Sequence, residues 1–178
     1  MDRTEKCLSS NILYSGSIIT LRLDQVELPS GKTARREVAG HSPAVGLIPV
    51  LDNGNVLLVR QFRYAVGKEL LEIPAGIVEK GEDTKEASLR ELQEETGYTA
   101  SSLEKIAEFY TSPGFSDELL IVYLATGLSE SRLDPDDDEF IELVEVPPKK
   151  LIEMLRTGEL SDGKTLSALS LYLLGKEL

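Results

Sequence analysis

The sequence has few of the residues on which cysteine and histidine chemistry depends. Its 178 residues include one cysteine, Cys7, one histidine, His41, and no tryptophan. A single thiol excludes an intrachain disulfide and a cysteine-based zinc site, and one histidine excludes a histidine-rich metal site. One histidine also leaves little material for histidine general-base catalysis. Any catalysis by this chain must therefore depend on carboxylates.

Long apolar runs and basic patches are also missing. No window approaches the roughly 18 uninterrupted apolar residues of a membrane helix, and the basic residues are scattered. We therefore expect neither a membrane nor a nucleic acid as a partner. Because the net charge is -12, a phosphate ligand would need cations to mediate its binding. The first ten residues lack the apolar stretch of a signal peptide, so we expect a cytoplasmic protein.

What the sequence does contain is a mixture of strand and helix patterns that fits one domain with a small appendage. Residues 18–38 predict a hairpin that turns at Pro29 to Lys32, and residues 45–62 predict a second hairpin that turns at Asp52 to Asn55. Three further strands and two helices are predicted, at 103–110, 119–125, 140–146, 149–156 and 164–174. Because there is no βαβ rhythm, we expect an α+β domain whose mixed sheet carries packed helices.

One further predicted helix carries its charges in an unfavourable place. Asp83 is a good N-cap and Gly97 a good stop, which predicts a helix that begins near Thr84. At 100° per residue, three glutamates near the helix end fall within one arc of about 100°: Glu91, Glu94 and Glu95. Like charges four residues apart, and negative charges in the last turn, each destabilise a helix by roughly 0.2 to 1 kcal/mol.

Two interpretations of this acidic face are open. A solvated surface is the ordinary fate of a glutamate run. Alternatively, oxygen-bearing side chains that converge without histidine or cysteine match a hard divalent cation such as Mg²⁺ or Mn²⁺. Arg90 neutralises one glutamate and not all three. Gly76 and Gly81 allow the backbone to bend close, and the Ala75 carbonyl is the candidate for a further ligand.

The segment from Gly76 to Tyr98 resembles a complete Nudix box. Gly76 is followed after five residues by Glu82, and after seven more by Arg-Glu-Leu-Gln-Glu-Glu-Thr-Gly-Tyr from Arg90 onward. Nine specified positions in 23 residues make a chance match very improbable. The resemblance implies a Nudix hydrolase with an α/β/α sandwich, a mixed central sheet and N-terminal antiparallel strands. We expect an N-terminal strand region at 1–42 and a Nudix hydrolase domain at 43–178.

Three segments outside the box resemble the ADP-ribose pyrophosphatase branch of this family: Arg60 to Arg63, Glu72 to Gly76 and Thr111 to Glu118. A proline about fifteen residues beyond the box, here Pro113, is associated with ADP-ribose hydrolysis. The resemblance implies metal-dependent cleavage of ADP-ribose to AMP and ribose 5-phosphate. In this branch the N-terminal strands exchange between two subunits, which implies a homodimer.

The resemblance also implies roles for residues of the box. The metal ligands would be Ala75, through its carbonyl, with Glu91, Glu94 and Glu95. They would hold two or three Mg²⁺ ions, with Mn²⁺ as an alternative. Arg90 would orient a box glutamate by ion pairing, and Glu82 would support the metal shell. We count Arg90 and Glu94 among the catalytic residues.

A general base is expected from the acidic loop before Phe140. In relatives a glutamate outside the box takes this role, and we choose Glu139. Asp136, Asp137 and Asp138 are close alternatives, and a solvated loop is the other interpretation of this run.

Substrate contacts are expected from charged residues outside the box. Arg60 and Arg63 belong to the first matching segment, and Arg63 is the candidate for the diphosphate. Arg36 and Glu37 are candidates for reaching the adenine or ribose from the partner subunit, although an exposed arginine near a hairpin is more often a surface charge. Glu118 either contacts metal or ribose or caps the strand that follows it.

Two other functions compete with ADP-ribose hydrolysis. The first is hydrolysis of other nucleoside diphosphate sugars, because shared diphosphate contacts bind such substrates comparably and pocket shape sets the choice. The second is a nucleotide sensor without turnover. A sensor needs no complete set of box carboxylates, so the intact box argues against it.

Overall fold

The computed structural model describes residues 2–133 and 140–175. The chain divides into two compact units, and each is described by itself. Unit 1 comprises Met1–Pro43 and Tyr110–Leu119, and unit 2 comprises Ala44–Phe109 and Leu120–Leu178. The predicted base Glu139 and its three aspartate alternatives lie outside the described residues.

Unit 1 is built on a three-stranded antiparallel sheet in the order β1-β2-β3. Its strands are β1 (Lys6–Ser15), β2 (Ile19–Glu27) and β3 (Thr33–His41). The predicted first hairpin is confirmed as β2 and β3, and Gly31 supplies the positive φ of 79° in its turn. Strand β1 was not predicted. All of its residues are exposed, so no alternation of buried and exposed positions marks it in the sequence.

Residues 110–119 belong to unit 1 because they pair with its third strand. Ala39 forms a parallel bridge with Ser116, and the Ala39 N–H donates to the Phe115 carbonyl at 2.7 Å. Asp117 accepts from the His41 N–H at 2.9 Å and pairs with Arg22 at 3.4 Å. This loop, which carries part of the family resemblance, is therefore held by the sheet of unit 1.

The strands of unit 2 form two sheets, in the orders β10-β5-β6 and β7-β4-β9-β8. They are β4 (Ala44–Pro49), β5 (Val56–Arg63), β6 (Lys68–Glu72), β7 (Ala75–Ile77), β8 (Tyr98–Tyr110), β9 (Leu119–Glu130) and β10 (Ile141–Val146), with a short 3-10 helix η1 (Tyr64–Val66) between β5 and β6. Strand β4 runs parallel to β9 and antiparallel to β7. The predicted mixed sheet is thereby confirmed, although β6 and β7 were not predicted.

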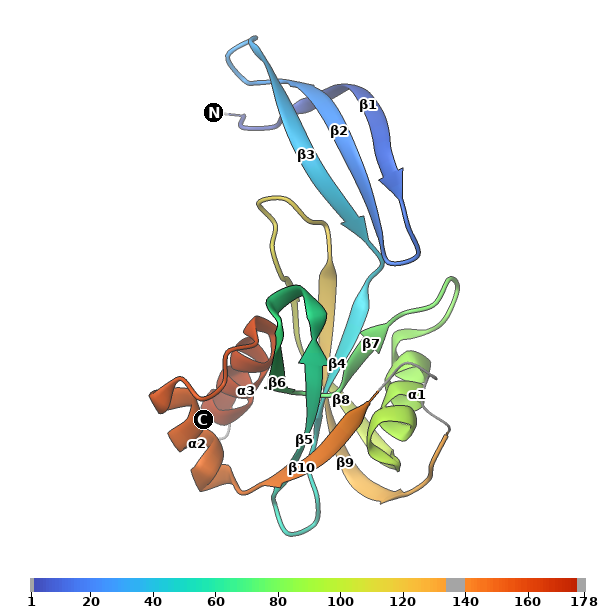
Figure 1. Ribbon diagram of the computed structural model, residues 1–178, viewed down its shortest axis with the longest axis vertical. Coiled ribbons are helices and arrows are strands. Elements are labelled where there is room, and N and C mark those ends of the chain that lie inside the picture. The colour runs from blue at the N-terminus through green and yellow to red at the C-terminus, as the bar shows by residue number, and fades with distance from the viewer. Residues whose placement is uncertain (1, 134–139, 176–178) are drawn as a thin grey trace. The chain divides into compact units, whose positions relative to one another are not determined.

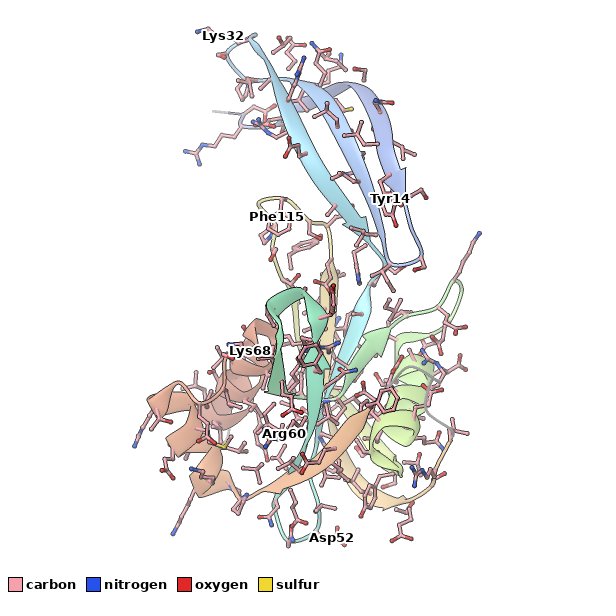
Figure 2. The ribbon with its side chains drawn as sticks, in the orientation of Figure 1. Tyr14, Lys32, Asp52, Arg60, Lys68 and Phe115 are labelled. Carbon is pink, nitrogen blue, oxygen red and sulfur yellow. The ribbon has the colours of Figure 1, made fainter. Side chains whose placement is uncertain are left out.

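The second predicted hairpin is wrong. The turn forms, with the Leu51 N–H donating to Asn55 O at 2.9 Å and Gly54 at φ 83°, and Asp52 lies at its tip (Figure 2). Beyond the turn, however, β4 pairs with β7 and β9 while β5 pairs with β6 and β10. Within the described chain, these two flanks share one isolated bridge, Val50 to Val56. Both strands contain buried apolar runs, so each takes neighbours on both edges and joins a separate sheet.

Three helices pack on these sheets. They are α1 (Thr84–Thr96), α2 (Pro148–Thr157) and α3 (Gly163–Gly175). Helix α1 lies on one side of the strands of unit 2, and α2 and α3 lie on the other (Figure 1). The main core is formed by residues of the sheets and of α2 and α3, among them Ile48, Leu58, Ile73, Val122, Leu151 and Leu169. The expected α/β/α arrangement is present.

Helix α1 has the predicted ends. The Asp83 side chain accepts from the Lys85 N–H at 2.8 Å, and Gly97 ends the helix at φ 76°. Leu92 is fully buried against Leu47 and Ala125 on the side that faces the sheet. In the described part of the chain, no helix is long and apolar enough to cross a membrane.

Candidate active site

The last turns of α1 lie against the short strand β7, which begins at Ala75. Glu95 accepts from the Ala75 N–H at 2.9 Å. The Glu91 carboxylate packs on Gly76 so closely that a Cβ at this position would overlap it. Both glutamates are only 8% exposed. The glycine that opens the box is therefore required by the close approach of a box carboxylate.

Arg90 is the centre of a set of ion pairs that we call the Arg90 cluster: Arg90, Glu82, Glu91 and Glu94. Its Nε donates to Glu82 at 3.0 Å, and its Nη1 donates to Glu91 at 2.6 Å and to Glu94 at 3.0 Å. Its Nη2 reaches Glu82 at 3.2 Å and the Ile77 carbonyl at 3.0 Å. The guanidinium thus contacts three carboxylates and the end of β7, more than the one partner expected from the sequence.

The Arg90 cluster is not electrically balanced, because one guanidinium faces three carboxylates. Hydrogen bonding to Glu82 raises the pKa of Arg90 against the opposing effect of burial, and the charge of Glu91 adds to the rise. In return, the hydrogen bond from Arg90 lowers the pKa of Glu82. Arg90 and Glu82 are therefore both ionised at neutral pH. Excess negative charge remains in a partly buried place where water screens it poorly.

The expected convergence of Glu91, Glu94 and Glu95 on one point is not seen. In the ranges that the structure describes, no group of three or more histidine, cysteine or acidic side chains is assembled as a metal site. The reason is visible in the contacts, since Glu91 and Glu94 turn to Arg90 while Glu95 turns to Ala75. The donor chemistry nevertheless fits a hard divalent cation, because three partly buried carboxylates pair with the single guanidinium of Arg90.

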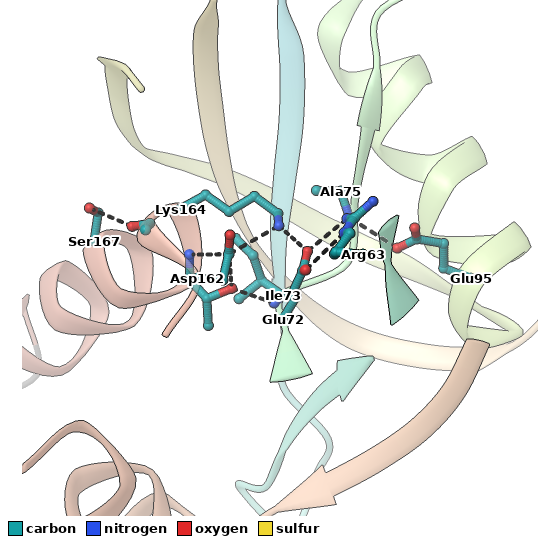
Figure 3. A network of polar contacts seen from close by, with 10 residues as sticks. Arg63, Glu72, Ile73, Ala75, Glu95, Asp162, Lys164 and Ser167 are labelled. Carbon is teal, nitrogen blue, oxygen red and sulfur yellow. Dashed lines mark hydrogen bonds and ion pairs between the residues drawn. The ribbon is translucent and has the colours of Figure 1, made fainter. Parts of the chain in front are cut away.

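A second set of ion pairs lies at the other end of the 72–75 segment, and we call it the Glu72 network: Arg63, Glu72, Asp162 and Lys164 (Figure 3). Glu72, at the end of β6, is 1% exposed. It accepts from Arg63 Nε at 2.8 Å and Nη2 at 2.7 Å, and from Lys164 Nζ. Lys164 also pairs with Asp162 at 3.0 Å. Two cations face two carboxylates, so this network is balanced.

The structure gives local partners to most of the predicted substrate residues. In unit 1, Arg36 pairs with Glu5 at 2.6 Å, and Glu118 accepts from the Thr111 hydroxyl. Glu37 and Pro113, also in unit 1, are exposed. In unit 2, Arg60 pairs with Glu142 across β5 and β10 at 3.0 Å. None of these contacts tests the predicted roles, which stay predictions.

The sequence alone does not reveal the Glu72 network. Glu72 lies in a segment that resembles the family and Lys164 begins the predicted helix 164–174, and neither receives a role from the sequence. The position of Lys164 could have indicated the network. A lysine in the first turn of a helix opposes the helix dipole, so a nearby carboxylate is expected. The same reasoning, with the sign reversed, had singled out the glutamates of α1.

The fold and the carboxylate-bearing helix α1 define the class of this protein. Residues 40–169 match the NUDIX domain family, and residues 5–39 match the nucleoside diphosphate sugar hydrolase N-terminal domain. The chain belongs to the Nudix hydrolases, whose members generally depend on divalent metal ions.

Individual relatives are similar over nearly the whole chain. An ADP-ribose pyrophosphatase of Bacillus subtilis (strain 168) is 45% identical over 97% of this chain and 94% of its own length. A methanol dehydrogenase activator of Bacillus methanolicus is 40% identical over 92% of this chain and 90% of its own. A crystal structure described as an ADP compounds hydrolase superposes with a TM-score of 0.87 and 22% identity, covering 98% of this chain and 96% of that chain. This last likeness shows the fold alone.

Proposed function

We propose that this chain hydrolyses ADP-ribose to AMP and ribose 5-phosphate. The observation that carries the proposal is the 45% identity to an ADP-ribose pyrophosphatase, which extends over 97% of the chain and so includes the segments outside the box. The unbalanced Arg90 cluster supports it, because a substrate with two phosphates needs bound cations to approach a protein of net charge -12.

The cations in this proposal are two or three Mg²⁺ ions, with Mn²⁺ as a substitute. Glu91 and Glu95 would be the principal ligands, with Glu94 and the Ala75 carbonyl completing the set. When bound, such ions neutralise a diphosphate and lower the pKa of a water molecule that attacks phosphorus. Arg90 holds the Glu91 and Glu94 carboxylates at fixed positions by ion pairing, at 2.6 and 3.0 Å.

Arg63 is the proposed contact to the diphosphate. Its side chain is 40% exposed, while Nε and Nη2 are held by Glu72. Within the described residues Nη1 makes no hydrogen bond, which leaves this nitrogen for a phosphate oxygen. The hydrogen bonds to Glu72 raise the pKa of Arg63, and the charge of Glu95 adds to the rise. The Arg63 guanidinium is therefore close enough to Glu95 for an electrostatic interaction.

The remaining predicted roles belong to the same proposal. Arg60 lies on the strand that ends at Arg63, and Glu139 is the proposed general base from the loop before Phe140. Arg36 and Glu37 are proposed to reach the adenine or ribose from the partner subunit, and Pro113 and Glu118 are the other proposed substrate contacts.

A homodimer is part of the proposal, with residues 1–42 as the dimerisation region and 43–178 as the hydrolase domain. Every residue of β1 is exposed in the described chain, although an isolated three-stranded sheet gains little stability without a covered face. Large apolar side chains between residues 8 and 19 are exposed: Leu8, Ile12, Leu13, Tyr14, Ile18 and Ile19. A second copy is the proposed cover. With one cysteine and no disulfide to protect, we also propose a cytoplasmic location.

Hydrolysis of another nucleoside diphosphate sugar is the alternative. It is favoured by one observation, the match of residues 5–39 to the N-terminal domain of nucleoside diphosphate sugar hydrolases. A sensor without turnover is disfavoured, because a sensor has no use for the carboxylate excess around Arg90.

A substrate panel tests the proposal. The purified chain is assayed with Mg²⁺ and with Mn²⁺ on ADP-ribose, ADP-glucose, GDP-mannose, NADH, diadenosine polyphosphates and 8-oxo-dGTP, and the products are identified. The highest kcat/KM for ADP-ribose, with AMP and ribose 5-phosphate in equal amounts, is the expected result. A higher kcat/KM for another sugar nucleotide would favour the alternative, and absence of turnover on every compound would overturn the enzymatic function.

A further inference from the structure

The Glu72 carboxylate is buried and charged, and the reaction proposed above does not use it. Burial raises the pKa of Glu72, but the hydrogen bonds from Arg63 and the charge of Lys164 outweigh that effect and leave the pKa below its usual value. A buried carboxylate is costly unless cations and hydrogen bonds compensate it. Here the two cations come from different elements, Arg63 from the end of β5 and Lys164 from the start of α3.

The start of α3 is fixed to the same segment by a contact in which Lys164 takes no part. The Thr165 hydroxyl accepts from the Ile73 N–H at 2.9 Å and donates to Asp162 at 2.6 Å. Asp162 also accepts from the Thr165 N–H at 2.9 Å, in the manner of an N-cap. Thr165 is fully buried. Helix α3 is therefore docked on the 72–75 segment without help from Lys164.

Lys164 itself lies in an unfavourable position for a cation. It belongs to the first turn of α3, where the helix dipole is positive, and its side chain is mostly buried. Glu72 and Asp162 compensate its charge on two sides. A residue that is placed against the dipole, in a helix that is already docked, calls for a role other than helix stability.

We propose that Glu72 and Lys164 are positioning residues, which fix the Arg63 guanidinium so that its remaining nitrogen faces the diphosphate beside Glu95. This inference rests on the proposed function, since it assigns Arg63 to a phosphate. The bidentate contact leaves the Arg63 fork little freedom to rotate, so little entropy is lost when a phosphate binds. Lys164 donates to Oε2 of Glu72, the oxygen that also accepts from Arg63 Nη2, and its charge balances Asp162.

The charges indicate what happens when Lys164 is lost. Arg63 then remains as the single cation of the network for two carboxylates, Glu72 and Asp162. It is drawn toward α3 and away from Glu95, which weakens its contact with the diphosphate. Because the hydrogen bond from Ile73 to Thr165 and the burial of Leu169 in the main core do not involve Lys164, the fold is retained.

The experiment compares Lys164→Met with Lys164→Arg and with a matched control. Methionine keeps the length of the apolar stem without the charge, and arginine restores the charge. Lys150→Met is the control, because Lys150 on α2 also pairs with two glutamates, Glu153 and Glu159, but on the exposed surface. KM and kcat for ADP-ribose and the melting temperature are measured for each protein.

We expect Lys164→Met to raise KM about 10-fold with kcat changed by less than about 3-fold, and Lys164→Arg to recover most of the loss. In an Arg63→Met background, adding Lys164→Met should change KM by less than about 2-fold, because the group it positions is gone. Lys150→Met should match the unmodified protein. An unchanged KM in Lys164→Met, or the same fold-change in both backgrounds, would overturn the inference.

Binding of ADP in the presence of Mg²⁺, measured by calorimetry, separates this inference from the proposed function. ADP carries the diphosphate without the second ribose. If ADP-ribose is not hydrolysed but Lys164→Met weakens ADP binding about 10-fold, the positioning role stands and the proposed function falls. If ADP-ribose is hydrolysed and Lys164→Met affects neither KM nor ADP binding, the reverse holds. If the unmodified chain neither hydrolyses ADP-ribose nor binds ADP, both are overturned.

Discussion

The two helix ends that meet the 72–75 segment both carry charges that oppose their helix dipoles, yet they are compensated differently. At the start of α3, Lys164 finds Glu72 and Asp162, and the Glu72 network has as many cations as carboxylates. At the end of α1, Arg90 is shared by Glu82, Glu91 and Glu94 in the Arg90 cluster. Glu95, in the last turn, adds one more carboxylate beside Ala75.

This difference separates a network whose charges are balanced by the chain's own side chains from a cluster that is suited to binding a cation. A balanced buried network needs nothing else, and its function is to hold a side chain in place. A cluster in which several carboxylates share one arginine near a helix C-terminus is stabilised by an added cation, since like charges there repel one another and oppose the helix dipole. The comparison predicts that substitutions in the two regions act on different quantities, turnover in one and substrate binding or stability in the other.

The largest effect is expected at Glu95, a proposed metal ligand. Glu95→Gln should lower kcat for ADP-ribose by at least roughly 100-fold with an unchanged fold, because a charged metal ligand is lost. Steady-state kinetics and circular dichroism measure the two quantities. Glu86→Gln is the control, because Glu86 is exposed on the same helix. Near-normal turnover in Glu95→Gln would refute the role of this carboxylate.

A smaller effect is expected from substitution of Gly76, which packs against the Glu91 carboxylate. Gly76→Ala should lower kcat/KM by about 10-fold, because the new methyl group displaces the Glu91 carboxylate from its place. The melting temperature should change by less than about 3 °C, since only the end of a flexible side chain has to move. In Gly163→Ala the methyl group meets open space, which makes it the control. An unaffected kcat/KM would show that the close approach of Glu91 to β7 is not needed.

The smallest effect is expected in the Glu72 network, where substitution of Glu72 should change how the melting temperature depends on pH. The pKa of Glu72 is lower in the folded state than its usual value of 4.5, so its charge stabilises the fold above that pH, and this contribution is lost as the pH falls below it. Glu72→Gln lacks the contribution at every pH. The difference in melting temperature between the two proteins should therefore be largest near neutral pH and shrink below about pH 4.5. A difference that grows on acidification would have the wrong sign.

The sequence predicted features that depend on local chemistry. Asp83 and Gly97 set the ends of α1 because capping is decided within a few residues, and Gly31 fixed the first hairpin for the same reason. The pairing of β4 with β9 was not predictable, because a buried apolar run does not reveal which edge it shares with which distant strand.

The candidate site shows the same division. The box residues lie within one segment, so their spacing was readable, as was the acidic face of α1. The Glu72 network joins residues up to 92 positions apart, from Glu72 to Lys164, and such contacts exist only after folding. The sequence also could not predict that Glu91 turns to Arg90 while Glu95 turns to Ala75. Helical spacing determines which face of the helix a side chain occupies, but it does not determine the rotamer of that side chain.

The central claim is that the carboxylates at the end of α1 bind divalent cations. Titration of the metal-free protein with Mn²⁺, followed by the paramagnetic resonance of the free ion, tests this claim most directly. The unmodified chain and Lys164→Met should bind Mn²⁺ alike, whereas Glu91→Gln and Glu95→Gln should each bind it at least about 10-fold more weakly. Equal Mn²⁺ affinity in all four proteins would contradict the account.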